Sequence, residues 1–74
     1  MRKKVDSFDA VDESGNVQTI CVYQDFHKET VRGSSFFVPG LKEACLEDGT
    51  PLNRQTDDLF IAALDGRRFQ RLRR

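Results

Sequence analysis

The chain contains one histidine, His27, and two cysteines, Cys21 and Cys45, which are the side chains best suited to act as base and nucleophile. Residues 17–26 have the composition of a β-strand, and Cys21 and His27 are six positions apart on it. At the rise of an extended chain this separation is about 20 Å, so the two side chains cannot form a catalytic pair. We therefore expect His27 to be a solvated residue at a strand end.

The two cysteines are 24 positions apart, and each has apolar neighbours. A metal site would need both of them and His27 to converge with a fourth ligand, and the sequence has no C-x-x-C or H-x-x-x-H pair to support this. Two cysteines are also too few for a disulfide-dense secreted scaffold. We predict reduced, structural cysteines, and neither a metal nor a cofactor.

Acidic side chains occur in three adjacent pairs, and each pair flanks a turn: Asp12-Glu13, Glu47-Asp48 and Asp57-Asp58. Aspartate accepts hydrogen bonds from backbone N–H groups in turns, which explains the pairs without catalysis. A hydrolase would need two pairs to meet across a cleft, and a chain of 74 residues has little material to build one. The glycines do not form a phosphate-binding loop. We expect that the protein is not an enzyme.

Basic side chains are concentrated at the two ends of the chain. Residues 1–4 hold three and residues 67–74 hold five, whereas residues 5–66 hold four basic and twelve acidic side chains, so the zero net charge conceals a segregated chain. If the first and last strands are neighbours, these charges merge into one patch that could contact nucleic-acid phosphates, with an aromatic ring to stack on a base. The candidate contacts are Arg2, Lys3, Lys4, Arg67, Arg68, Phe69, Arg71, Arg73 and Arg74. Alternatively, the charges protect edge strands from aggregation or pair with the acidic middle.

The elements that position these residues are mostly strands. Residues 17–26 are rich in β-branched and aromatic side chains, and a turn signal at 13–16 separates them from residues 3–11, whose alternation breaks between Val5 and Phe8. This predicts a hairpin over 3–26 with a bulge in its first strand. Residues 30–33 form the next turn, and a short strand over 34–38 is expected to stop at Pro39-Gly40.

The second half of the chain is less clearly patterned. The spacing of Leu41, Ala44 and Cys45 mildly favours a short helical turn over 41–47, although a strand ending in the turn at Asp48-Gly49 also fits. We expect a loop over 50–56. Asp65-Gly66 then predicts a hairpin of 59–64 with 67–73, in which Phe69 pairs with either Ala62 or Ile61.

Together these elements predict one mainly β domain over 1–74, a small, strongly curled antiparallel sheet or barrel-like fold of four to five short strands. Closing or curling the sheet is how a chain of this size would hide its edges.

Residues 41–74 carry a pattern of a Leu-x-Asp-Gly turn, a hydrophobe and Asn, an acidic pair, an aromatic strand, a Gly turn and a basic strand. The residues that carry it are Leu46, Asp48, Gly49, Leu52, Asn53, Asp57, Asp58, Phe60, Gly66 and Arg71. This part of the chain resembles a group of small bacterial proteins with which we associate no established activity. The resemblance implies a strand ending at Leu46, but no catalytic residue.

No apolar run approaches the ~20 residues of a membrane-spanning helix, and the basic start is not followed by the apolar stretch of a secretory signal. We therefore expect a cytoplasmic protein with no membrane contact. The function that we predict is a small, non-catalytic β interaction or accessory domain, which contacts an unidentified protein partner or a second copy of itself. The alternative is a nucleic-acid-binding module that uses the basic terminal strands.

Overall fold

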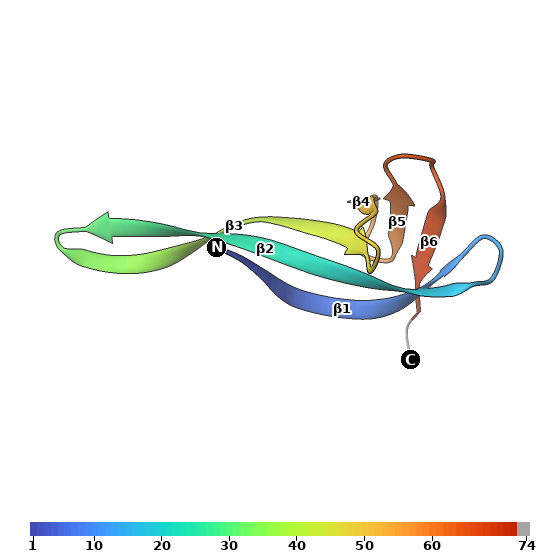
Figure 1. The fold of residues 1–74 in the computed structure, drawn as a ribbon, viewed down its shortest axis with the longest axis horizontal. Helices are drawn as coiled ribbons and strands as arrows, with labels where there is room; N and C mark the ends of the chain where they lie inside the picture. The colour runs from blue at the N-terminus through green and yellow to red at the C-terminus, as the bar shows by residue number, and fades with distance from the viewer. Residues whose placement is uncertain (73–74) are drawn as a thin grey trace.

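The computed structural model describes residues 1–72, which form an all-β fold of six antiparallel strands in a closed barrel with the order β1-β2-β3-β4-β5-β6 (Figure 1). The strands are β1 (Arg2–Asp12), β2 (Val17–Val31), β3 (Ser34–Leu46), β4 (Pro51–Arg54), β5 (Leu59–Ala62) and β6 (Arg68–Arg71). The predicted mainly β, barrel-like class is confirmed. The predicted count of four to five strands is too low by at least one.

The core occupies one end of the molecule, where all six strands meet. Phe69, Ile20 and Leu46 are its largest fully buried side chains, and the rest of the cluster consists of Ala10, Leu52, Phe60 and Ala62. Side chains alternate between the two faces of a strand, so every second residue of these segments points into the barrel. Because β6 pairs with both β1 and β5, Phe69 lies opposite Asp12 on one side and Phe60 on the other.

The predicted first hairpin is present, but its second strand, β2, continues five residues beyond 26 to Val31. β1 and β2 pair from Arg2 opposite Asp25 to Val11 opposite Val17, and the register shifts between Lys4 and Asp6. That shift is the bulge that the broken alternation indicated.

β3 is longer than expected, because it continues through Pro39-Gly40 instead of stopping there. The β2–β3 register shifts between Gln24 and Phe26, and this irregularity accommodates both residues within the strand. A Cβ on Gly40 would lie 2.9 Å from His27 Nε2, so only glycine fits there without a local shift. The carbonyl of Gly40 also accepts a hydrogen bond from Gln24 Nε2 at 3.0 Å.

The helical turn over 41–47 is wrong. Residues 41–46 are the last part of β3, with Ile20 opposite Leu46 and Val22 opposite Ala44. Strand geometry is preferred here because it puts Leu46 into the barrel core and gives its backbone a partner strand on β2.

Two further details of the second half differ from the sequence prediction. Residues 51–54 form β4 instead of a loop, which places the buried Leu52 between Ala44 and Ala62. In the last hairpin Phe60 lies opposite Phe69, a register that neither predicted turn gives, because the connection spans residues 63–67. Ala62 N–H closes this connection by donating to the carbonyl of Arg67 at 2.8 Å.

A long two-stranded hairpin projects from the barrel and determines the shape of the molecule (Figure 1). The dimensions are 54 × 28 × 21 Å, and the Cα radius of gyration is 15.1 Å, against about 11 Å for a compact domain of this length. We call residues 27–38 the arm: here β2 and β3 pair with each other, from His27 opposite Val38 to Val31 opposite Ser34, and with no other strand of the described chain.

The core predicts a sharp difference between two large apolar residues. Phe69→Ala removes a fully buried ring from the centre of the barrel, so we expect the free energy of unfolding to fall by about 3–5 kcal/mol. Leu41→Ala removes a side chain that is 84% exposed, and should change it by less than about 0.5 kcal/mol. Urea unfolding followed by circular dichroism measures both values. Equal losses in the two variants would contradict this description of the core.

Candidate interaction surface

Each face of the arm carries both polar and apolar side chains. Cross-strand partners share a face of the hairpin, so Lys28 and Phe37 lie on one side, while Glu29 and Phe36 lie on the other. Phe36 is 47% and Phe37 57% exposed, and Val31 near the tip is 54% exposed. Apolar surface is thus open to solvent on both faces of the same short hairpin.

The two edges of the arm differ in chemistry. On the β3 side the run from Ser34 to Leu41 contains no charged side chain, and β4 pairs with β3 only further along, at Ala44 and Cys45. On the β2 side, His27, Lys28 and Glu29 give the edge polar and charged groups. Edge strands of soluble proteins are normally protected by charges, so the β3 edge has the character of a strand that accepts a partner.

A tight turn holds the arm together at its tip. Arg32 and Gly33 connect the strands with φ values of 52° and 81°, the pair of positive angles that a type I′ hairpin turn requires. Such a turn sets the register, but an isolated two-stranded hairpin is at best marginally stable in water. The arm therefore lacks the packing that a third strand or a partner surface would supply.

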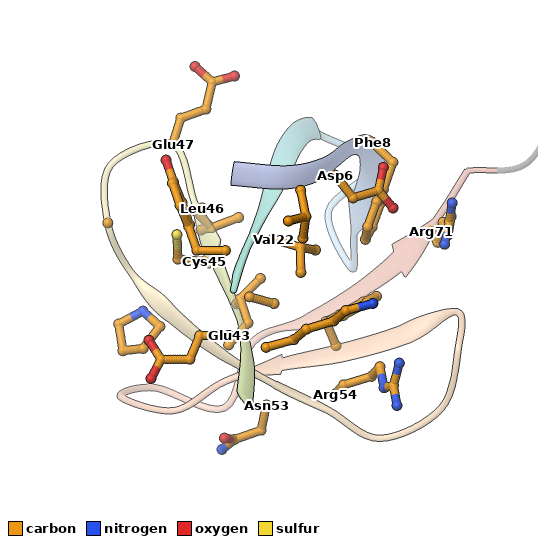
Figure 2. A pocket seen from close by; sticks show the side chains of 18 of the residues that line it. Asp6, Phe8, Val22, Glu43, Cys45, Leu46, Glu47, Asn53, Arg54 and Arg71 are labelled. Carbon is orange, nitrogen blue, oxygen red and sulfur yellow. The ribbon is translucent and has the colours of Figure 1, made fainter. Parts of the chain in front are cut away.

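A groove of about 1460 Å³ lies beside the barrel, and its lining includes the partly buried Phe8, Val22 and Ala44 (Figure 2). The guanidinium carbon of Arg71 lies 4.2 Å from the centroid of the Phe8 ring at one side of this groove. The charged side chains along it are evenly divided between basic and acidic: Arg2, Lys42, Arg54 and Arg71 against Asp6, Glu43, Glu47 and Asp57. With charges of both signs, the groove has no marked preference for an anion.

The structure brings some of the basic residues predicted to contact nucleic acid near one another and leaves others apart. β1 and β6 are neighbours, but they pair only where Ala10–Asp12 meets Phe69–Arg71. Lys3 and Lys4 lie at the other end of β1, opposite Gln24 and Tyr23, and the six residues from Lys4 to Ala10 span about 20 Å. Because β1 and β6 are antiparallel, the end of β6 that carries Arg71 is directed toward the basic start of β1, and Arg2 and Arg71 line the same groove.

Several of these candidates also have partners within the chain. Arg2 lies 3.4 Å from a carboxylate oxygen of Glu43, and Arg67 forms an ion pair of 2.7 Å with Asp65. The ring of Phe69 is fully buried, so it presents no face for stacking on a base. Arg68 is exposed at the start of β6, and the candidates Arg73 and Arg74 lie outside the described residues.

In two of the three acidic pairs, the aspartate accepts hydrogen bonds in a turn, as predicted. Asp12 accepts the backbone N–H groups of Ser14 and Asn16, both at 2.9 Å. Asp48 accepts the N–H of Thr50 at 2.9 Å and its hydroxyl at 2.6 Å. These hydrogen bonds, the hydroxyl first, hold the pKa of the Asp48 carboxyl below its ordinary value of 3.8.

His27 and the cysteines occupy different places. His27 is exposed at the base of the arm, whereas Cys21 is buried in the part of β2 that belongs to the barrel. Cys45 lies directly opposite Cys21 on β3, a pairing that the separation of 24 positions did not suggest. Within residues 1–72 no three His, Cys, Asp or Glu side chains gather as a metal site would require.

The sequence prediction missed Phe36 and Phe37 as surface residues. Their signal was present in the uncharged run from Ser34, which directly follows the turn residues Arg32-Gly33. The arm was missed because the expected stop at Pro39-Gly40 separated the strand over 34–38 from residues 41–46, which lie in the barrel.

Comparison of the chain with protein-family models, curated proteins and solved structures gave no match. The resemblance of residues 41–74 to small bacterial proteins therefore stays a prediction. Among the described residues there is no helix long and apolar enough to cross a membrane. The geometry of the arm is consequently the main guide to function.

The turn at Asp48 predicts a specific dependence of stability on pH. A carboxyl whose pKa is lowered by folding stabilises the fold above its ordinary pKa, and this contribution disappears as the pH falls through the lowered value. Asp48→Ala should therefore lower the free energy of unfolding at pH 7, and the difference from the parent protein should shrink below pH 3.8. Urea titrations at several pH values measure it.

Glu47→Ala is the matched control, because it removes a neighbouring exposed carboxylate. We expect it to show no such pH-dependent difference. A penalty for Asp48→Ala that stays constant down to pH 2 would contradict the role of the carboxylate.

Proposed function

We propose that the protein is a small interaction domain that binds through the free β3 edge of the arm, and that the partner is a second copy of the chain. The observation that carries this proposal is the run from Ser34 to Leu41, which is an exposed edge strand without a charged side chain. In strand addition, main-chain hydrogen bonds provide affinity and alternate side chains contact the partner.

A second copy fits this edge for reasons of charge and symmetry. Two copies of an uncharged strand meet without repulsion, whereas on the β2 edge a two-fold axis at Lys28 or at Glu29 would place like charges opposite each other. Antiparallel pairing of β3 with itself about a two-fold axis uses the same residues on both chains, which is the symmetry of most soluble dimers. The arms would then form a four-stranded sheet, and Phe36 and Phe37 would gain cross-strand neighbours.

The alternative of nucleic-acid contact has less support. It requires the basic ends of the chain to act together, and the structure separates Lys3 and Lys4 from β6 along the length of β1. Arg2 and Arg67 are also engaged with carboxylates.

Light scattering coupled to size-exclusion chromatography tests the dimer. We expect the mass of two chains at high protein concentration, with dissociation to one chain on dilution. Phe37→Lys places a charge in the middle of the uncharged edge, on each copy near the two-fold axis, and should give one chain at every concentration.

Leu64→Lys is the matched control. Leu64 is 81% exposed in the connection between β5 and β6, so this variant adds the same charge to an apolar surface position outside the arm. It should dimerise like the parent protein, and both variants should retain the circular dichroism of the folded barrel. A parent protein that is strictly monomeric at high concentration, or a Phe37→Lys variant that still dimerises, would overturn the proposal.

A further inference from the structure

The strand register brings the two cysteines of the chain face to face. Cys21 on β2 and Cys45 on β3 are direct cross-strand partners, one position away from the pair of Ile20 and Leu46. Ile20 and Leu46 belong to the buried core, and neighbouring residues on a strand point to opposite faces. Both thiols therefore lie on the same outer face of the barrel wall.

Directly opposed residues of an antiparallel pair have Cα atoms about 4.5–5.5 Å apart. A disulfide requires a Cα separation of about 4.4–6.8 Å, so the backbone is already placed for the bond. The Cβ atoms of such partners are about 4.5–5.5 Å apart, and a disulfide needs about 3.5–4.5 Å, so closure requires only a small approach of the strands. Bonds made under such strain are reduced more easily than relaxed ones.

We propose that Cys21 and Cys45 form a reversible cross-strand disulfide, with a small-molecule disulfide such as oxidised glutathione as the oxidant. This site is independent of the interaction through the arm. It assigns the two cysteines a redox role in place of the purely structural one expected from the sequence.

The exchange proceeds in two balanced steps. The Cys45 thiolate attacks one sulfur of oxidised glutathione, the glutathione S–S bond breaks, and the leaving thiolate takes up the proton that Cys45 released. The Cys21 thiolate then attacks the Cys45 sulfur and displaces the second glutathione, which is protonated in the same way. Two protein thiols are oxidised by two electrons, and one oxidised glutathione becomes two reduced molecules.

Exposure determines the order of these steps. Cys45 is partly exposed on β3, next to β4. Cys21 is 5% exposed on β2, which lies between β1 and β3. The oxidant therefore reaches Cys45 first, and Cys21 resolves the mixed disulfide from the adjacent strand.

The surroundings of Cys45 predict that the exchange is slow at neutral pH. Burial is the main cause that raises the pKa of the Cys45 thiol, and the neighbouring Cys21 raises it further. Arg2 on β1 opposes this, while Glu43 and Asp48 add to it, and β4 contributes the non-ionising Pro51 opposite Cys45. Because the thiolate is the nucleophile, the rate should rise about tenfold from pH 7 to pH 8.

Mass spectrometry of the full chain after incubation with oxidised glutathione tests the site. We expect a product lighter than the reduced chain by two hydrogen atoms, with no thiol left to alkylate after unfolding, and a single cross-linked peptide pair containing Cys21 and Cys45. Dithiothreitol should restore both thiols. A higher midpoint of thermal unfolding should accompany the bond, because it restricts the unfolded chain.

Single variants separate the two roles. Cys21→Ser should stop at the mixed disulfide and carry one glutathione on Cys45, and Cys45→Ser should remain unmodified while folded. Non-reducing electrophoresis distinguishes the bond within one chain from a bond between two chains. Retention of both thiols in the oxidised parent protein, or a product linked only between chains, would overturn the proposal.

Discussion

The pairing of β6 with β1 is the interaction on which the rest of the structure depends. Three residues of each strand, Ala10–Asp12 and Phe69–Arg71, close the sheet on itself. Without this contact the buried ring of Phe69 would be exposed, and both outer strands would present unpaired backbone groups. Closure concentrates the few large apolar side chains of a short chain at one end, and nothing remains to cover the far halves of β2 and β3.

The sequence predicted the class of fold and the first hairpin, because those depend on local patterns. The β-branched and aromatic run of 17–26 and the broken alternation near Val5 are visible in the residues themselves. The rest depends on pairing between distant segments. Leu52 forms part of a strand because Ala44 and Ala62 lie on either side of it, and Pro39-Gly40 stays within β3 because β3 takes up one extra residue opposite Gln24–Phe26.

The candidate surface shows the same division between local and distant information. The separation of charges along the sequence is visible in the residues, but the distances between charged segments depend on register, which leaves Lys3 and Lys4 about 20 Å from the short segment of β1 that pairs with β6. For the cysteines, register had the opposite effect and brought together two residues that are distant in sequence. The arm was not predicted because the expected strands ended at residue 26 and at Pro39-Gly40, so the sequence prediction did not connect residues 27–38 to the strands of the barrel.

If two chains pair through the arm as proposed, its unequal edges bear on the size of the assembly. A chain that adds to the β3 edge of a neighbour covers the only uncharged edge on each arm, and the new sheet then ends on both sides in the β2 edge, with His27, Lys28 and Glu29. Further growth would then use edges that carry Lys28 and Glu29 in place of an uncharged strand. In the proposed dimer, therefore, no second uncharged arm edge is left to which a third chain could add, which favours a finite particle over a fibre.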